Sequence, residues 1–546
     1  MNPAAETPSA LGRLARFASW SLLAYWAVFA AVAPLINIDS QMYHVARLEL
    51  AARGGLFNNG WFTSMYHVLW PWTFDAVHLP FLGLGWGYAL PSFACFAGLC
   101  FVVHAMMRAH FGFDAAWVAV AGLLGLTCLV YQATSTSNDI PILFSGAVWT
   151  YARWRRAREN KNVHLFWMVL AIGFMAGAKT TGMLYAAILS AWTLWELRAD
   201  RKLLARVIAG LVGSLVLLGS SETYVESARV FGHPLGPPEY LRSLKNSDGI
   251  RGGLANLTRY VAGSVYVGPA MVGDPPGAVT RVIKAEQALL TWTGLNNQGA
   301  RGRTNDNALF LFQSGIEELS GFGPIGMFAM AIMLVAVVWW RPRTLWWQLA
   351  AIGLVGVLIV SFGVGYTYWG NRYLIAWYAL ASVACVCALW EHQGRAAHFL
   401  RWSFAACAVA SAVAAPLLSF NRRPVDIAAS FSDRDRLETS AYPLSGVVRN
   451  RLRELHRSNP SSRVYYVVCT DSVIFPILED HDLHAHLVTP PRFVELIKAG
   501  QVSPGDLVIE DCPSGASILR PIEEVSAPDI FSRANLRRQI IYRVSP

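Results

Sequence analysis

The sequence predicts a polytopic α-helical membrane protein with about eleven transmembrane helices and a small C-terminal extracytoplasmic α/β domain. The 546-residue chain is 54% hydrophobic and only 15% charged, whereas roughly 25% of residues are charged in typical soluble domains. Its apolar residues fall in runs of about 15 to 25, a length that crosses the hydrocarbon core of a bilayer. Most of the chain is therefore expected to lie in a membrane.

Lysine and arginine predict the orientation, because cytoplasmic loops carry an excess of positive charge. Basic residues precede the first apolar run and follow later ones at alternate loops. They are Arg13, Arg16, Arg108, His110, the segment Arg153 to Lys161, Arg198, Arg201, Lys202, Arg206, Arg341, Arg343, Arg395 and Arg401. With the amino terminus in the cytoplasm, the loops at 37–80, 134–139, 221–321 and 366–372 lie outside. The membrane domain then covers residues 1–420, and the tail at 421–546 is extracytoplasmic.

Two apolar regions can be divided into membrane spans in more than one way. The region Val163 to Leu197 exceeds one span and has Lys179 at its middle. We expect a short hairpin there, because one long helix would hold the ammonium group near mid-membrane at a cost of a few kcal/mol. The sequence Ala31-Val32-Ala33 resembles a signal-peptidase site, but the apolar run before it exceeds the roughly 7 to 15 residues of a signal peptide. We therefore expect an uncleaved first helix.

The tail from about Asn421 to Pro546 changes composition sharply and predicts a small α/β domain. Strand patterns occur in RVYYVV at 463–468, LHAHLVT at 483–489, GDLVIED at 505–511 and RQIIYRV at 538–544. A helix is expected in PRFVELIKAG, which Gly500 closes. No GxGxxG, Walker or HExxH pattern occurs in the tail, so structural support or contact with an acceptor is its expected role.

Charge and cysteine usage narrow the function classes further. The formal net charge is +10, but inside-loop residues explain much of it and no nucleic-acid-binding motif is present, so nucleic acid is not an expected partner. Cys469 and Cys512 lie in the tail, where a disulfide stays open. The other cysteines lie in apolar runs and are expected to pack as small apolar side chains.

Ionisable and aromatic residues gather after the first apolar run, in NIDSQMYHVARLE. Asp39 comes about one helical turn after the membrane exit, within reach of a lipid head group. On a continuing helix Asp39, Tyr43 and Arg47 share one face, and His44 lies beside them. The alternatives are a helix cap for Asp39 and a structural, hydrogen-bonded role for His44. We treat Asp39 as a candidate catalytic residue and the other three as candidate substrate-binding residues.

Three further outer segments carry polar or charged side chains. In TSTSNDIP, Asn138 and Asp139 stand where the next span begins, although these residue types are also typical of helix capping. Lys179 in GAKTTG lies among small residues, with interfacial snorkelling as the alternative. YTYWGNRYL places Arg372 and Tyr373 in the shortest outer loop. An aromatic belt explains the tyrosines there, but not an arginine on the outer side.

Two carboxylates, one or two cations and several aromatic residues suit the transfer of a sugar from a lipid phosphate. This leaving group is already an anion, so it needs Lys or Arg to stabilise the charge that it gains and no protonated acid. An acceptor hydroxyl needs a base aligned for attack on the anomeric carbon, which one carboxylate supplies. Asp39 has the better position for this base, and Asp139 is the second carboxylate.

Five short segments occur in order between Asp39 and Tyr373: DSQMYHVARLE, TSNDIP, GAKTTG, GFGPIG and GNRYL. In this ordered set the sequence resembles the GT-C superfamily of polyprenyl-phosphate-sugar-dependent glycosyltransferases, which includes protein O-mannosyltransferases and the lipid A aminoarabinose transferase. The resemblance, which extends to bacterial family-39-like members, implies catalysis at the outer face of the bacterial inner membrane. It implies Asp39 as base or metal-linked carboxylate, with Lys179 and Arg372 near the phosphate of a polyprenyl-phosphate sugar donor.

The implied reaction is inverting transfer of a hexose or pentose to an envelope glycan, lipid or protein acceptor. The sequence departs from the family in the first outer loop, because many relatives carry paired acidic residues there and Ser40 follows Asp39 here. A divalent-metal requirement therefore stays open. Glu317 and Glu318 are either acceptor or metal ligands or the start of a solvated helix. The tail matches no segment of the family, so the acceptor is not carried over.

The large outer loop at 221–321 contains the Gly- and Pro-rich stretches GHPLGPPEY and RGRTNDN. We expect it to lie along the membrane surface as short helices and loops, in position to cover the proposed site, since loops of this length are usually functional or disordered.

Two other classes stay open. A transporter or flippase for a lipid-linked saccharide is expected to show internal repeats and broken helices with binding residues near mid-membrane, and the sequence shows no two-half symmetry. An envelope scaffold would leave Asp39 dispensable. The clustering of ionisable groups on one side favours the enzyme.

Overall fold

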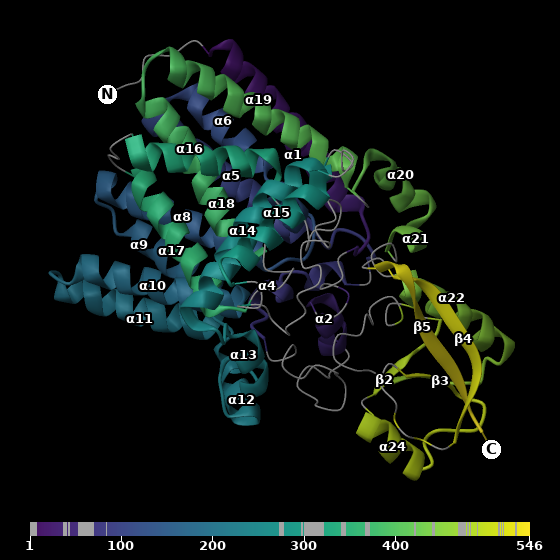
Figure 1. Cartoon of the computed structure of the whole chain (residues 1–546). Helices are drawn as coiled ribbons and strands as arrows, with labels where there is room; N and C mark the ends of the chain where they lie inside the picture. The colour runs from purple at the N-terminus through teal and green to yellow at the C-terminus, as the bar shows by residue number, and fades with distance from the viewer. Residues whose placement is uncertain are drawn as a thin grey trace.

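The chain is described by a computed structural model in which most of the sequence is placed. The described residues are 8–36, 41, 44–52, 70–82, 84–271, 278–295, 299, 322–339, 345–365, 372–419, 422–438, 443–467, 477, 480, 482–488, 490–510, 514, 516, 518–529 and 532–545. Asp39, Tyr43, Glu317, Glu318, Cys469 and Cys512 lie outside them. The structure is a bundle of helices followed by a tail that contains a five-stranded sheet (Figure 1).

The bundle and its outer segments are built from helices. They are α1 (Ala10–Val32), α2 (Val45–Ala52), α4 (Thr73–Ala76), α5 (Leu90–Phe111), α6 (Phe113–Gly125), α7 (Thr127–Ala133), α8 (Asp139–Glu159), α9 (Val163–Ala178), α10 (Thr180–Leu197), α11 (Arg201–Leu218), α12 (Ser221–Phe231), α13 (Pro238–Leu244), α14 (Gly249–Met271), α15 (Ala278–Trp292), α16 (Gly323–Trp339), α17 (Leu345–Gly363), α18 (Ile375–Glu391) and α19 (Arg395–Leu418). Local chemistry sets several of these ends. The Ser9 side chain accepts the Gly12 N–H at the start of α1, and Asp200 caps α11 in the same way through Leu203.

The chain is an integral membrane protein. Within the described residues, α1, α5, α18 and α19 are each long and apolar enough to cross a bilayer. The number rises to six if the bent pairs α6–α7 and α11–α12 each form one span, and α9, α16 and α17 contribute shorter apolar stretches. The expected count of about eleven spans therefore stays a prediction.

The predicted hairpin between Val163 and Leu197 is confirmed. Helix α9 ends at Ala178 and α10 begins at Thr180, with Lys179 between them in an extended backbone conformation. Two glycines allow the close packing at this turn. A Cβ atom at Gly182 would overlap the Met175 carbonyl oxygen, and one at Gly177 would overlap that of Leu218 in α11.

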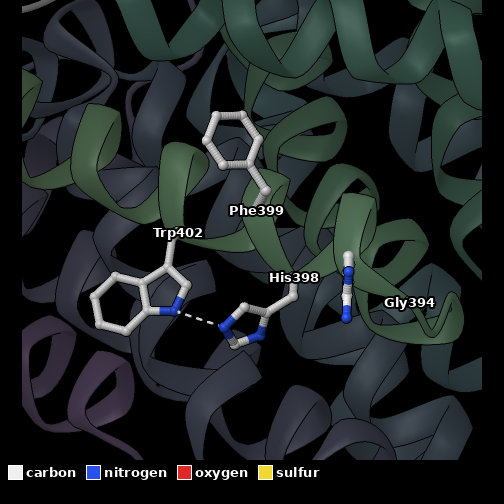
Figure 2. A pocket seen from close by; sticks show the side chains of 5 residues that line it. Gly394, His398, Phe399 and Trp402 are labelled. Atoms are coloured by element: carbon white, nitrogen blue, oxygen red, sulfur yellow. Dashed lines mark hydrogen bonds between the residues drawn. The ribbon is translucent and has the colours of Figure 1, made fainter.

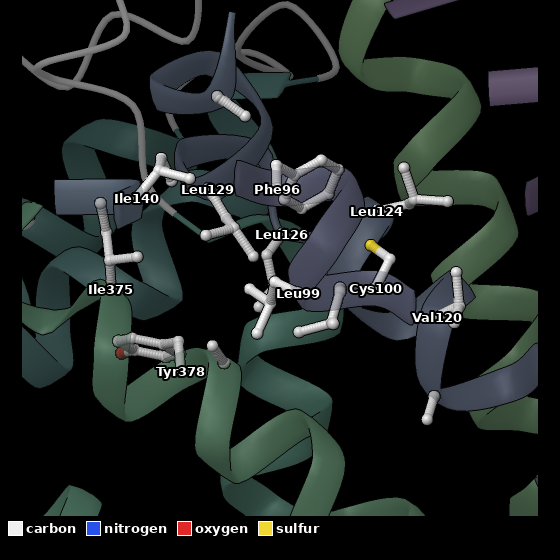
Figure 3. Close-up of a cluster of buried hydrophobic side chains, with 14 of the residues drawn as sticks. Phe96, Leu99, Cys100, Val120, Leu124, Leu126, Leu129, Ile140, Ile375 and Tyr378 are labelled. Atoms are coloured by element: carbon white, nitrogen blue, oxygen red, sulfur yellow. The ribbon is translucent and has the colours of Figure 1, made fainter. Parts of the chain in front are cut away.

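The core of the bundle lies where α5, α6, α7, α8 and α18 meet, and Figure 3 shows part of it. Phe96 and Leu99 of α5 face Leu126 and Leu129 of the α6–α7 elbow, with Tyr378 of α18 closing one side. The described cysteines in the apolar helices fit the small-hydrophobe interpretation, since five are buried and one is half-buried.

Two basic residues near helix ends contact side chains on neighbouring helices. The Arg16 guanidinium near the start of α1 lies 6.0 Å from the Phe113 ring at the start of α6. Arg153 near the end of α8 donates to Glu196 near the end of α10 at 2.7 Å. The His110 ring at the end of α5 lies 5.6 Å from the Trp154 ring of α8. These described segments therefore lie at one end of the bundle, which we call the basic end. The side of the membrane on which it lies stays a prediction.

The large outer segment contains more regular structure than expected. Short helices α12 and α13 are present, but residues 249–271 form one long helix, α14, that packs against α15, α16 and α17. Asn256 of α14 donates to the carbonyls of Ser361 and Val364 at 3.0 and 3.1 Å. These polar contacts anchor the segment to the end of α17.

The tail has the α/β character that the sequence predicts. Its elements are α20 (Pro424–Ser432), α21 (Arg434–Glu438), α22 (Pro443–Ser458), β1 (Val464–Val467), β2 (His486–Val488), α24 (Pro490–Lys498), β3 (Leu507–Glu510), β4 (Leu519–Asp529) and β5 (Ser532–Val544). The sheet order is β2-β1-β3-β5-β4. Strand β1 is parallel to β2 and β3, whereas β5 is antiparallel to β3 and β4. The four predicted strands and the predicted helix are confirmed, and β4 is an additional strand.

The tail docks on the first outer loop. Ala46 of α2 belongs to the same buried cluster as Leu444 and Val448 of α22. The Gln41 amide donates to the backbone carbonyl of Glu438 at 2.8 Å. These contacts put the first outer loop and the tail on the same side of the bundle, as the topology prediction requires.

Candidate functional site

An ion pair joins α8 to the hairpin turn. The Lys179 Nζ atom lies 2.9 and 3.0 Å from the two carboxylate oxygens of Asp139. Both side chains are only slightly exposed, at 14% for Lys179 and 11% for Asp139. Because α8 begins at Asp139 and α9 ends just before Lys179, the pair stands at the ends of two helices, where both side chains can reach a ligand.

The segment before α8 also holds the hairpin turn through Asn138. Its amide donates to the Ala178 carbonyl at 2.8 Å, and its side chain makes no hydrogen bond that caps α8. Ser137 instead accepts the backbone N–H of Asp139 at 3.3 Å. The capping alternative thus applies to Ser137, whereas Asn138 fixes the turn that carries Lys179.

Arg372 and Tyr373 complete this group from the start of α18. The Lys179 ammonium lies 5.8 Å from the centroid of the Tyr373 ring. The Arg372 guanidinium lies 5.8 Å from the same ring. We call Asp139, Lys179, Arg372 and Tyr373 the outer cluster. The structure therefore brings together four predicted site residues from segments 40 to about 230 positions apart.

An apolar cavity of about 390 Å³ lies in the bundle next to the outer cluster, bounded by α5, α8, α9, α10, α17 and α18. Three members of the cluster lie one helical turn from a residue that lines it. These pairs are Asp139 with Ile142, Lys179 with Met175, and Tyr373 with Ala376. The lining continues to His110, near the basic end. The outer cluster therefore lies about one helical turn from one end of this apolar cavity.

The first outer loop contains a buried network that the sequence analysis did not find. The Arg47 guanidinium pairs with Asp75 and donates to the carbonyls of Trp70 and Pro71 at 3.0 and 2.8 Å. His44 Nδ1 lies 3.0 Å from the Asp75 carboxylate. Arg47 and Asp75 are each 1% exposed. Sequence reasoning named His44 and Arg47 as substrate-binding residues, and in the structure both support the loop; their contact with substrate stays a prediction.

Burial and charge act against each other in this network. Burial raises the pKa of Asp75, but the neighbouring Arg47 and His44 outweigh it and hold this pKa at about 2. Burial lowers the pKa of His78 to about 4 despite the adjacent Asp75. At neutral pH the network therefore contains an ionised Asp75 and a neutral His78. A lone carboxylate within the aromatic stretch WPWTFD was the available sequence signal.

Ser220 connects this network to the hairpin. Its hydroxyl oxygen accepts the backbone N–H groups of Trp72 and Thr73, both at 3.0 Å. It also donates to the Gly177 carbonyl at 3.4 Å. Ser220 has a φ of +52°, which is rare for a residue other than glycine. The first outer loop and the turn that carries Lys179 are thus held by one residue between α11 and α12.

A shallow hollow at the start of α19 has a different character (Figure 2). Trp402 Nε1 donates to His398 Nε2 at 3.1 Å, and Phe399 points away from this pair. Phe399 is 69% exposed. Exposed aromatic residues with a basic neighbour are typical of a membrane interface, so this hollow is not part of the outer cluster.

Side chains that bind metal ions do not gather in the described part of the chain. Among the described residues, no group of three or more His, Cys, Asp or Glu side chains could hold a metal ion. Asp39, Glu317 and Glu318 are not described, so metal dependence stays open.

The helical bundle, its two bent helix pairs and the docked tail define an integral membrane protein. The crystal structure of ArnT from Cupriavidus metallidurans in the apo state is similar, with a TM-score of 0.51 and 13% identity over 98% of both chains. ArnT from the same organism bound to undecaprenyl phosphate matches with a TM-score of 0.49 and 14% identity over 98% of both chains. At these identities the likeness concerns the fold alone. No family model and no curated protein sequence matches the chain.

Proposed function

We propose that this protein is an inverting glycosyltransferase that moves a monosaccharide from a polyprenyl-phosphate donor to an envelope acceptor. The acceptor is a glycan, a lipid or a protein, and transfer occurs at the outer face of the bacterial inner membrane. The tail then lies in the periplasm. The observation that carries this proposal is the outer cluster of charges beside the end of an apolar cavity. The GT-C fold shared with ArnT supports the same class.

The two parts of the site match the two parts of a lipid phosphate. An isoprenoid chain gains free energy by leaving water for apolar surroundings, and the cavity offers such surroundings within the bundle. A phosphate group at the head of the chain needs cations, which Lys179 and Arg372 supply. The Tyr373 ring, whose centroid lies 5.8 Å from each of the two cations, offers a surface for a sugar.

In the structure the Lys179 ammonium group is paired with the Asp139 carboxylate. The phosphodiester of the donor carries one negative charge, as a carboxylate does, and gains a second when the sugar leaves. A bound donor therefore competes with Asp139 for the ammonium group, most strongly as this charge develops. Displacement of Asp139 leaves a second carboxylate beside the sugar. We therefore assign Lys179 and Arg372 to the donor phosphate and Asp139 to a supporting carboxylate role.

The base in the proposed reaction is Asp39, on the strength of its position in the sequence. It takes the proton of an acceptor hydroxyl while the oxygen bonds to the anomeric carbon from the side opposite the phosphate. The bond between this carbon and the phosphate oxygen breaks, and the phosphate keeps the electron pair. Lys179 and Arg372 stabilise the charge that the phosphate gains, as preorganised donors do in other transfer reactions.

The test is transfer from a panel of radiolabelled polyprenyl-phosphate sugars to membrane acceptors. Wild type is compared with Asp39→Asn, Lys179→Gln and Glu239→Gln at matched amounts of folded protein. Glu239 is an exposed acidic residue at the start of α13 and serves as the matched control. We expect transfer by wild type and by Glu239→Gln, and a loss of at least about 100-fold in the other two variants.

Each other result contradicts a stated part. Equal transfer by wild type and Asp39→Asn removes Asp39 from the chemistry. Equal transfer by Lys179→Gln removes the outer cluster from donor binding. Absence of transfer in every protein, with translocation of a labelled lipid-linked saccharide in reconstituted vesicles, replaces the enzyme with a transporter.

A further inference from the structure

The tail carries a groove that has no part in the proposed transfer. Its volume is about 920 Å³, and it lies beside edge strand β2, between α24 and the starts of β1 and β2. The segment between α24 and β3 closes it. The lining side chains that matter are Arg463, Tyr465, His486, Arg492 and Gln501. This size is that of a site for a small molecule.

The charged side chains that line the groove are arginines. Its lining contains Arg463, His486 and Arg492, all exposed, and no acidic residue. Arg463 donates to the Gln501 backbone carbonyl at 2.9 Å, which holds the guanidinium at the wall without an ion pair to an acidic side chain that lines the groove. Arg492 pairs at 2.8 Å with Glu495, which is 64% exposed. Such an exposed pair is weak, so a better-placed anion can take its place.

A flat ring surface forms another part of the wall. The rings of Tyr465 and His486 stack with centroids 5.4 Å apart and planes inclined by 30°. Tyr465 is fixed from below, because its hydroxyl donates to the Gln501 carbonyl at 3.1 Å and its ring contacts Phe493. The exposed His486 ring therefore rests on a rigid support and presents one face outward.

The groove lies on the face of the sheet that packs against α24. The opposite face packs against α22 and, through Ala46, against the first outer loop. Tyr465 and Val488 belong to the cluster on the α24 side, in which the described members all come from the tail. Figure 1 shows α24 at the lower end of the tail, below β2. Among the described residues, the buried contact of the tail with the first outer loop lies in the α22 cluster and not in the cluster beside the groove.

We propose that this groove binds an anionic saccharide, a sugar that carries a phosphate or carboxylate group. Guanidinium groups bind both anions through paired hydrogen bonds, and the supported His486 ring offers a surface for the apolar face of a sugar ring. The proposal goes beyond the transfer reaction. It gives the tail a ligand of its own on the outer side of the protein.

The experiment is equilibrium dialysis of the full-length protein in detergent against labelled glucose 6-phosphate, glucuronate, glucose and inorganic phosphate. We compare wild type with the double variant Arg463→Gln, Arg492→Gln. The matched control is Arg457→Gln, which removes the charge of an exposed arginine from α22, outside the groove. Neither variant alters the outer cluster.

We expect saturable binding of glucose 6-phosphate or glucuronate, at least about tenfold weaker in the double variant and unchanged in Arg457→Gln. Glucose and inorganic phosphate should bind at least about tenfold more weakly than the charged sugar. Absence of saturable binding by both charged sugars overturns the proposal, as does equal binding by the double variant. Equal binding of inorganic phosphate and glucose 6-phosphate removes the saccharide from it. Dialysis measures no transfer, so failure here and failure of the glycosyltransferase proposal are separate results.

Discussion

Replacing Asp75 by asparagine should destabilise the first outer loop strongly. Asparagine has nearly the same shape and keeps an acceptor oxygen for His44, so the main change is the loss of the negative charge. Arg47 is 1% exposed and loses its ion pair with Asp75, while its hydrogen bonds to the carbonyls of Trp70 and Pro71 remain. Removing one partner of a buried ion pair costs about 3 to 5 kcal/mol.

The pKa shift of Asp75 gives a second, smaller value for the contribution of this ion pair to the free energy of unfolding. Burial raises it, Arg47 and His44 lower it further, and the net fall is from 3.8 to about 2. A folded-state pKa below the unfolded value stabilises the protein above the unfolded pKa, and this contribution is lost as the pH falls towards 2. At neutral pH the shift is worth about 2 kcal/mol. The two routes together give a loss of about 2 to 5 kcal/mol for Asp75→Asn.

The assay is the fraction of protein that remains folded after heating in detergent, followed by gel filtration at one heating rate. A loss of about 3 kcal/mol lowers the melting temperature by about 6 to 12 °C if the unit that melts has about 150 to 250 residues. Glu239→Gln, which removes an exposed charge, should melt within about 1 °C of wild type. The double variant Arg47→Met, Asp75→Asn removes both charges and should recover part of the loss. A melting temperature of Asp75→Asn within 1 °C of wild type refutes the reasoning, and so does a double variant that is less stable than Asp75→Asn.

The remaining predictions concern the outer cluster, a second buried residue and the hairpin packing. Lys179→Gln, compared at matched amounts of folded protein, should lower kcat/KM for a lipid-phosphate donor by about 100-fold, and an equal kcat/KM would contradict this. Burial lowers the pKa of His78 from 6.5 in the unfolded chain to about 4. Neutral His78 therefore adds about 3 kcal/mol to the free energy of unfolding above pH 6.5, and this contribution is lost as the pH falls to 4. Melting temperature measured against pH should show this step in wild type, and a similar step in His78→Gln would assign it elsewhere. Gly177→Ala places a Cβ against the Leu218 carbonyl and should lower the melting temperature by several degrees, whereas Gly213→Ala meets nothing within 4 Å and should match or exceed wild type.

Sequence reasoning succeeded where length and local composition decide the structure. The hairpin at Lys179 follows from an apolar region too long for one span and from the cost of an ammonium group at mid-membrane. The strands of the tail follow from short β-branched and aromatic runs bounded by turn residues. In both cases the signal lies within a few residues of the feature that it predicts.

Sequence reasoning failed where partners are distant or where the surroundings override local preference. The pairing of Arg47 with Asp75 joins positions 28 apart across a loop, and no local pattern indicates it. Strand β4 was missed because Pro521, Pro528 and several charged residues lower its strand propensity. The structure places β4 at the edge of the sheet, where proline is tolerated because one side of the strand has no partner strand.

The site was predicted in part for the same physical reason. Asp139 and Lys179 were each recognisable as ionisable residues at the end of an apolar run. Their mutual contact at 2.9 Å depends on how α8 and α9 pack, which the sequence does not encode locally. The role of Ser220 depends on a backbone conformation with φ of +52° that serine seldom adopts, so its contacts with Trp72 and Gly177 had no sequence signal.

The docking of the tail on the first outer loop also sets an order of biogenesis. Gln41 leaves the ribosome early, yet its partner Glu438 lies 397 positions further along the chain. Ala46 likewise waits for Leu444 and Val448 of α22 before its apolar contacts are complete. The described part of the first outer loop therefore acquires its native packing only after the last helices of the bundle and the tail have been synthesised. A chain that stalls during synthesis lacks this packing, so completion of the polypeptide and maturation of the loop are coupled.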